Sequence, residues 1–207
     1  MSILSSHARR RARSRRGYTA IEVLLAMTVL LISTAGVMSM QKAAIQGNQD
    51  ARRLDLANSI ARTWLDRLAA DSTSWNANNG LAFTNWLGPL QGAGFQTPIA
   101  LVAGKAVWSP AFDILGRDLT TPTDPATVFC THVNISVVTS SGAPAAPVLI
   151  QATVLVFWPK SLSNGGVPAT PLCGGAGTGV ADVAAAEATT PGTYHMIYAS
   201  ESIRRSS

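Results

Sequence analysis

The sequence has few of the side chains that carry out chemistry. Only 13% of its 207 residues are charged and 6% are aromatic, and it holds two cysteines and three histidines. His7, His132 and His195 stand alone, without the spacing of metal ligands. No pair of acids and no nucleophile beside a base marks a catalytic centre. We therefore expect a protein that is not an enzyme and that needs neither a metal nor a cofactor.

Other patterns that signal ligand binding are also missing. The glycine-rich run at 174–179 fits neither G-x-G-x-x-G nor G-x-x-x-x-G-K-[ST], so we interpret it as a flexible loop. The pattern of an N-glycosylation site occurs at Asn134-Ile135-Ser136. Because it falls inside a predicted strand, we do not interpret it as a modification site. We expect the tryptophans to anchor the core and loops rather than to stack bases; they are Trp64, Trp75, Trp86, Trp108 and Trp158.

Basic residues are concentrated at the N-terminus. The net charge is +5, but six of the sixteen basic residues lie between positions 9 and 16, with no acid nearby. Without residues 1–17, ten basic residues face eleven acidic ones, a net charge of −1. The suggestion of nucleic-acid binding rests on this short segment alone, so we do not expect nucleic acid as a partner. The apolar fraction of 47% excludes a disordered chain.

One long apolar run follows the basic segment, and no second run of this length occurs. Val23–Met40 has no charged residue, and the run counted from Tyr18 holds one carboxylate, Glu22. This length spans a bilayer as a helix. The basic flank holds the N-terminal end in the cytoplasm. The pattern predicts a single-pass inner-membrane protein with its N-terminus inside and its C-terminal part exported.

Two ordinary interpretations of this segment are open. A secretory signal peptide would use Ser33-Thr34-Ala35 before Gly36 as its cleavage site, but Glu22 would then interrupt its apolar region. A plain transmembrane anchor would use Thr19–Glu22 as a T-x-x-E capping box. The first predicts a soluble protein that begins near Gly36, a secreted binding module.

A third interpretation depends on the string Gly17-Tyr18-Thr19-Ala20-Ile21-Glu22-Val23-Leu24. It resembles the class III leader of type IV pilins and pseudopilins, in which a basic leader ends in Gly, an aromatic residue becomes the first mature residue and Glu follows at the fifth. Tyr18 instead of the commoner Phe, and Ala20 instead of Leu or Met, are mild departures. The resemblance implies cleavage between Gly17 and Tyr18 by prepilin peptidase, and N-methylation of Tyr18.

The resemblance also implies a role for Glu22. In the family this carboxylate is thought to neutralise the terminal amine of a neighbouring subunit and to set the axial register of the fibre. A simpler alternative is that Glu22 pairs with its own new N-terminus, one helical turn away, at the favourable end of the helix dipole. The sequence leaves both roles open.

The remaining periodicity predicts an α+β, pilin-like fold. A helix at 18–71, with 18–40 as its membrane and polymerisation part, continues with apolar residues every four positions: Leu56, Ile60, Trp64 and Leu68. Arg52, Asp55, Ser59, Arg62 and Asp66 form its opposite, polar face. Residues 72–127 form a connecting region with short elements at Leu81–Leu87 and Lys105–Trp108.

Residues 128–207 are predicted to form an antiparallel sheet head on which the helix packs. Alternating residues favour strands at Val128–Val138, Val148–Trp158 and Tyr194–Ile203, the first two as a hairpin. A variable loop occupies 161–192. Cys130 lies in the first strand and Cys173 in this loop. Because an exported head is in an oxidising compartment, we expect a Cys130–Cys173 disulfide, with two free thiols as the alternative.

Within this family, three segments resemble those of PilV-type minor pilins: Ala35–Gln41, Leu56–Ala61 and the strand ending in Phe157-Trp158-Pro159. It implies a minor subunit of the priming or tip complex of a pilus. Its partners would be prepilin peptidase, other pilins through the N-terminal helix, and a tip adhesin or adaptor. The alternatives are a minor pseudopilin of type II secretion, placed in a periplasmic pseudopilus, and a competence pseudopilin.

Overall fold

The computed structural model of the protein describes residues 17–76, 80–92, 94–98, 110–121, 124–141, 146–160, 173, 192 and 194–205. Helix α1 spans Ala20–Asp71, and short 3-10 helices follow at Ser72–Ser74 and Leu81–Phe83. The strands are β1 (Ala111–Phe112), β2 (Phe129–Ser141), β3 (Ala146–Pro159) and β4 (Tyr194–Arg204). The chain divides after Gln49 into two compact units.

The first unit holds the apolar part of α1. Its described residues are exposed, and α1 is, in the part of the chain that the structure describes, the helix long and apolar enough to cross a membrane. Its best 18-residue window has a mean hydropathy of 2.1. Four hydroxyls donate to carbonyls three or four residues earlier, at 2.8–2.9 Å; they are Thr28, Ser33, Thr34 and Ser39. Because these polar groups are bonded within the helix, their transfer into lipid costs less than that of unbonded hydroxyls.

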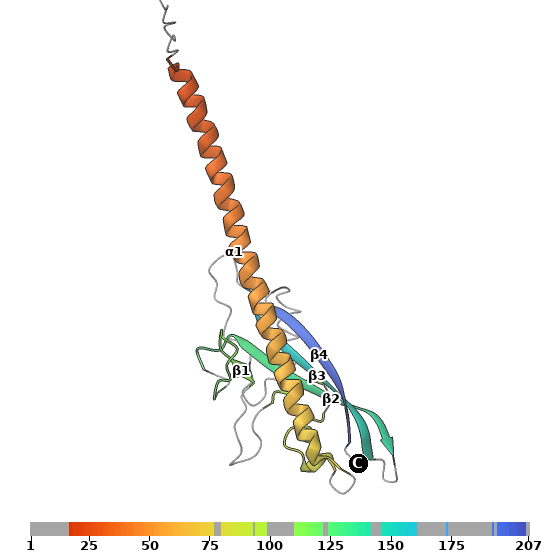
Figure 1. Ribbon diagram of the computed structural model, residues 1–207. Coiled ribbons are helices and arrows are strands. Elements are labelled where there is room, and N and C mark those ends of the chain that lie inside the picture. The colour runs from red at the N-terminus through yellow and green to blue at the C-terminus, as the bar shows by residue number, and fades with distance from the viewer. Residues whose placement is uncertain are drawn as a thin grey trace, which may run out of the picture. The chain divides into compact units, whose positions relative to one another are not determined.

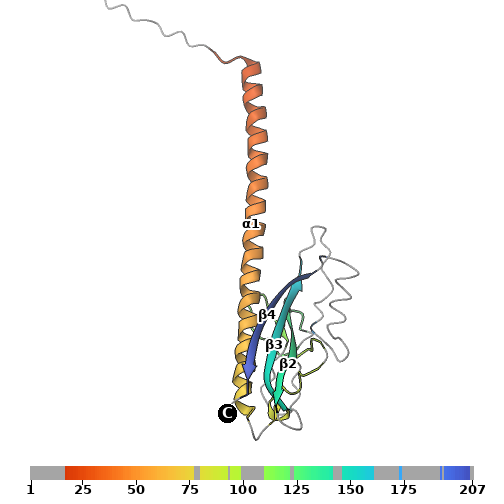
Figure 2. The same ribbon diagram turned by 90° about the vertical axis from the view of Figure 1, so that its right-hand side faces the viewer.

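The second unit is built on the C-terminal half of α1, which lies along one face of the sheet (Figures 1 and 2). The buried helix residues are Ala57, Ile60, Ala61, Trp64, Leu65, Leu68 and Asp71. The predicted apolar face is therefore confirmed, with Leu56 half-buried at its start. The predicted polar face is confirmed as well, since all five of its residues are exposed.

The four strands form one antiparallel sheet in the order β1-β2-β3-β4. The predicted hairpin is confirmed, with Val133 opposite Val154 in β2 and β3. The third predicted strand corresponds to β4, which pairs with β3 over its whole length. Strand β1 was not predicted, because two residues are too few to show an alternating pattern. The predicted element at Lys105–Trp108 lies outside the described residues.

Apolar residues cover both faces of the sheet. Because successive side chains of a strand point to opposite faces, β3 directs Val154 and Val156 toward α1, and Leu155 and Phe157 away from it. The second face carries its own buried cluster, which comprises Ala111, Cys130, Leu155, Phe157 and Cys173. The α+β class predicted from the sequence is thus confirmed as one long helix with an antiparallel sheet. The second cluster was not expected.

Candidate functional site

The predicted cleavage site lies immediately before α1. Gly17, Tyr18 and Thr19 have no regular secondary structure, and the side chain of Tyr18 is 82% exposed. No heavy atom of the described chain lies within 4 Å of the position that a Cβ would take on Gly17. An exposed, non-helical backbone is the form that a peptidase cleaves most readily. The Gly17–Tyr18 bond is therefore accessible in this structure.

Glu22 lies in the first turn of α1 and is exposed. The backbone N–H groups of Glu22 and Val23 donate to the carbonyl of Thr19 at 3.0 and 3.3 Å, which closes the start of the helix. An acid in this position is stabilised by the positive end of the helix dipole. Gly17, Tyr18 and Glu22 thus share one short exposed segment, with Glu22 about one helical turn from Tyr18.

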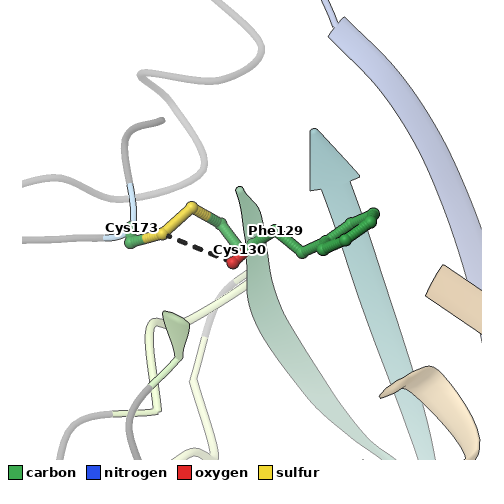
Figure 3. The surroundings of a disulfide bond; sticks show 3 residues. All are labelled: Phe129, Cys130 and Cys173. Atoms are coloured by element: carbon green, nitrogen blue, oxygen red, sulfur yellow. Dashed lines mark hydrogen bonds between the residues drawn. A yellow bond between two sulfur atoms is a disulfide. The ribbon is translucent and has the colours of Figure 1, made fainter. Parts of the chain in front are cut away.

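The structure joins Cys130 and Cys173 in a disulfide, with their Cα atoms 5.0 Å apart (Figure 3). Both residues are buried on the sheet face away from α1. The Sγ atom of Cys173 also lies 3.8 Å from the carbonyl oxygen of Phe129. Position 173 is therefore fixed on strand β2, although the two cysteines lie 43 positions apart in sequence.

The carboxylate of Asp71, at the end of α1, holds the following loop. One oxygen accepts the N–H of Asn85 at 2.8 Å, and the other accepts those of Trp86 and Leu87 at 2.7 and 3.0 Å. The loop places the ring of Trp86 edge-on against Trp64, with centroids 5.6 Å apart. This role of Asp71 was not predicted from the sequence. The available signal was an acid at the C-terminal end of a helix, where the dipole disfavours it unless donors surround it.

A second carboxylate organises the turn after β1. Asp113 accepts the N–H groups of Leu115 and Arg117 at 2.8 and 2.9 Å, and Arg117 Nε at 2.8 Å. Gly116 adopts φ +75°, a conformation that other residues rarely take. Burial tends to raise the pKa of the Asp113 carboxyl, but the hydrogen bonds from Arg117 and Leu115 outweigh it and the pKa lies below its ordinary value. The Asp-x-x-Gly spacing was the signal for this turn.

The same turn is fastened to α1 by an ion pair. The guanidinium of Arg67 meets both carboxylate oxygens of Asp118, at 2.6 and 3.1 Å. Arg67 also lies over the ring of Trp64, 5.1 Å from its centroid. Two-point pairs of this kind hold orientation as well as distance. The pairing links residues 51 positions apart, and no local pattern predicts it.

His132 and His195, the histidines in the described part of the chain, do not form a common site. His132 is buried and contacts Phe157 of the cluster away from α1, with ring centroids 5.0 Å apart. His195 stacks on Trp158, which faces α1, at 5.3 Å. No group of three or more His, Cys, Asp or Glu side chains that could hold a metal occurs among the described residues. His7 lies outside them.

The tryptophans and the remaining sequence patterns lie in the core, in strand β2 or outside the described residues. Trp64, Trp75, Trp86 and Trp158 are buried, which confirms them as core anchors. Asn134 lies mid-strand in β2, opposite Thr153. Trp108 and the run 174–179 lie outside the described residues.

No protein-family model, curated protein or solved structure matches the chain. The fold and the N-terminal segment together define a helix that can enter a membrane, attached in sequence to a disulfide-bonded α+β head.

Proposed function

We propose that the chain is a minor type IV pilin, a non-enzymatic subunit of the priming or tip complex of a pilus. One observation carries the proposal: an exposed Gly17–Tyr18 bond directly precedes a 52-residue helix with Glu22 in its first turn. After cleavage, this helix would have an ammonium group and a carboxylate at its apolar end. Such a helix can remain in the membrane or exchange lipid for the helices of neighbouring subunits.

The proposal assigns a role to each part of the chain. Prepilin peptidase removes residues 1–17 on the cytoplasmic side, and Tyr18 is then N-methylated. Residues 18–40 anchor the subunit in the inner membrane with the head outside, and later pack against other pilins in the fibre. The Glu22 carboxylate forms an ion pair with the N-terminal amine of a neighbouring subunit, because a carboxylate in an apolar environment needs a partner. The head presents an adhesin or adaptor at the tip.

An ordinary signal peptide accounts less well for the same observations. Its cleavage site, before Gly36, falls in the interior of α1, where the backbone is helical on both sides. Thr34 and Ser39 donate their hydroxyls to helix carbonyls around this point. Cleavage there would divide a helix that is otherwise continuous from Ala20 to Asp71.

Two leucine variants test the proposal against this alternative. Gly17→Leu should leave the full-length precursor in the membrane, because the residue before the cleaved bond must be small. Ala35→Leu is the matched control, since Ala35 precedes the bond that a secretory signal would use and is exposed in α1. We expect normal processing of the control on immunoblots. The opposite pattern, with Ala35→Leu blocked and Gly17→Leu processed, would support a secretory signal.

A minor pseudopilin of type II secretion is the second candidate. It shares the leader, the helix and the sheet, and it differs in where the processed subunit is found. Processed subunit in fibres sheared from the cell surface would support a pilin. Processed subunit confined to the inner membrane would favour a secretion pseudopilus. A competence pseudopilin is less favoured, because the mature chain is near neutral and DNA binding depends on basic side chains.

A further inference from the structure

The sheet face that points away from α1 carries polar side chains beside the disulfide cluster. Figure 2 shows α1 on one side of β2, β3 and β4, which leaves this face on the other side. Alternation along the strands assigns to this face six short side chains with hydroxyl or amide groups. They are Asn134 and Ser136 of β2, Gln151 and Thr153 of β3, and Ser200 and Ser202 of β4. We call these six residues the polar patch.

The sheet register aligns the polar patch in two rows. One row joins Asn134, Thr153 and Ser200, and the other joins Ser136, Gln151 and Ser202. In the first row the hydroxyl oxygens of Thr153 and Ser200 lie 3.1 Å apart. Ser200 and the whole second row are exposed, and the other two members are half-buried. The patch is therefore a level array of hydrogen-bond donors and acceptors that faces solvent.

An aromatic ring and a cation lie at the two ends of the patch on β4. Tyr198 is 61% exposed, and its ring is supported by Phe95, with centroids 5.9 Å apart. Arg204 is exposed, and its side chain makes no hydrogen bond or ion pair in the described part of the chain. Glu201, the one acid in β2, β3 and β4, points to the opposite face by alternation. At the usual rise of a strand, about 20 Å separate Tyr198 from Arg204.

The composition of the patch fits a sugar polymer better than a protein. The cores of protein–protein interfaces are rich in aromatic side chains and depleted in serine, whereas three of the six members of the patch are serines. Hydroxyls and amides both donate and accept hydrogen bonds, as the hydroxyls of a sugar do. Small molecules bind in concave sites, so a ligand of this level face needs length rather than depth. A polysaccharide has both properties.

The two ends of the patch define the ligand further. The C–H groups on the face of a sugar ring can pack on an aromatic ring such as that of Tyr198. A guanidinium can pair with a carboxylate through two hydrogen bonds. Because Arg204 gives this face a positive charge and no acid of the three strands shares the face, the complementary sugar chain carries carboxylates.

We propose that the polar patch, with Tyr198 and Arg204 at its ends, binds an acidic polysaccharide. One sugar ring stacks on Tyr198, a carboxylate pairs with Arg204, and the sugar hydroxyls between them bond to the two rows. The inference goes beyond the proposed function, because it gives the head a ligand of its own, whether the chain belongs to a pilus or to a secretion pseudopilus.

Calorimetric titration of the full-length protein tests this ligand. The protein is kept in an uncharged detergent without sugar headgroups, and the probes are a galacturonate hexamer, the neutral maltohexaose and polyglutamate. We expect the galacturonate hexamer to bind. Maltohexaose should bind at least about fivefold more weakly, because it has no carboxylate for the guanidinium. Polyglutamate should also bind at least about fivefold more weakly, because it has no sugar ring to stack.

Variants assign the binding to the patch. Arg204→Gln should weaken binding of the galacturonate hexamer about fivefold, to the level of maltohexaose. Arg62→Gln is the matched control, since Arg62 is exposed on α1, and it should bind as the parent does. Tyr198→Ala should weaken binding about fivefold, whereas Tyr198→Phe should preserve it, because the ring is retained.

Three results would overturn the inference. They are no binding of the galacturonate hexamer, equal binding of either other probe, and equal effects of Arg204→Gln and Arg62→Gln. None of these results bears on the proposed function, which is tested by processing at Gly17 and by the cell fraction that contains the processed subunit.

Discussion

The carboxylate of Asp71, at the last residue of α1, accepts the backbone N–H of Trp86 at 2.7 Å. Together with the hydrogen bonds from Asn85 and Leu87, this contact holds the loop that places Trp86 against Trp64. The group is 8% exposed, so the three amides depend on it rather than on water. The head is therefore tied to its helix by polar contacts as well as by apolar packing.

Replacing Asp71 by Ala should destabilise the head by about 2–3 kcal/mol, because buried amides would lose a charged acceptor. Thermal unfolding of the full-length protein in detergent measures the effect. Asp66→Ala is the matched control, since Asp66 is exposed on the polar face of the same helix; it should change the free energy of unfolding by less than about 0.5 kcal/mol. Equal effects of the two variants would contradict the role of Asp71.

Removing the Cys130–Cys173 disulfide should lower stability substantially. A bridge that spans 43 residues contributes about 4 kcal/mol in the chain-entropy model. The double variant Cys130→Ser/Cys173→Ser should therefore unfold on the order of 10 °C below the parent. The parent treated with a thiol reductant should match the variant, and the variant should not respond to reductant. A double variant that unfolds at the parental temperature would contradict this contribution.

Asp113 should make the head sensitive to acid. Its folded pKa is lowered, so its contribution to stability is present above the unfolded pKa of about 3.9 and is lost as the pH falls through the lower, folded value. Asp113→Asn should cost about 1–2 kcal/mol at neutral pH and should flatten the loss of stability below about pH 4. The measurement is the unfolding temperature against pH. If Asp113→Asn keeps the full acid dependence of the parent, this assignment is wrong.

Glu22→Ala should separate processing from assembly. Cleavage needs the Gly17–Tyr18 bond, whereas Glu22 is proposed to act on the new ammonium afterwards. We expect a normally processed subunit that is incorporated into fibres at about a tenth of the parental level or less. A tenfold loss corresponds to an ion pair worth about 1.4 kcal/mol. Quantitative immunoblots of membrane and fibre fractions measure it. Unimpaired incorporation would leave Glu22 with only its role at the helix terminus.

The helix and the long strands could be predicted because their signals are local. The four-residue repeat from Leu56 to Leu68 and the alternation from Val148 to Trp158 reflect burial on one helix face and on a pleated sheet. The predicted helix began at Tyr18, two residues before α1. The strand at Val128–Val138 ends three residues later in the structure, after a register shift between Val137 and Thr139.

The contacts that hold the head together could not be predicted in the same way. Asp71 meets Trp86 across 15 residues, and Arg67 meets Asp118 across 51, so no periodic pattern records either. Strand β1 exists because Ala111 and Phe112 pair with Cys130 and Phe129, not because of its own two residues. The N-terminal motif could be predicted, because Gly17, Tyr18 and Glu22 lie within six consecutive positions of the sequence.

The N-terminus of the mature protein is the most direct test of the central claim. Mass spectrometry of a tryptic digest of sheared fibres should detect the peptide Tyr18–Lys42. Its mass should exceed the mass calculated from the sequence by one methyl group. An uncleaved chain would instead give a peptide that begins at Gly17, because trypsin cleaves after Arg16. The account predicts the methylated Tyr18 peptide in the fibre fraction. A soluble protein that begins near Gly36, with no peptide starting at Tyr18, would contradict it.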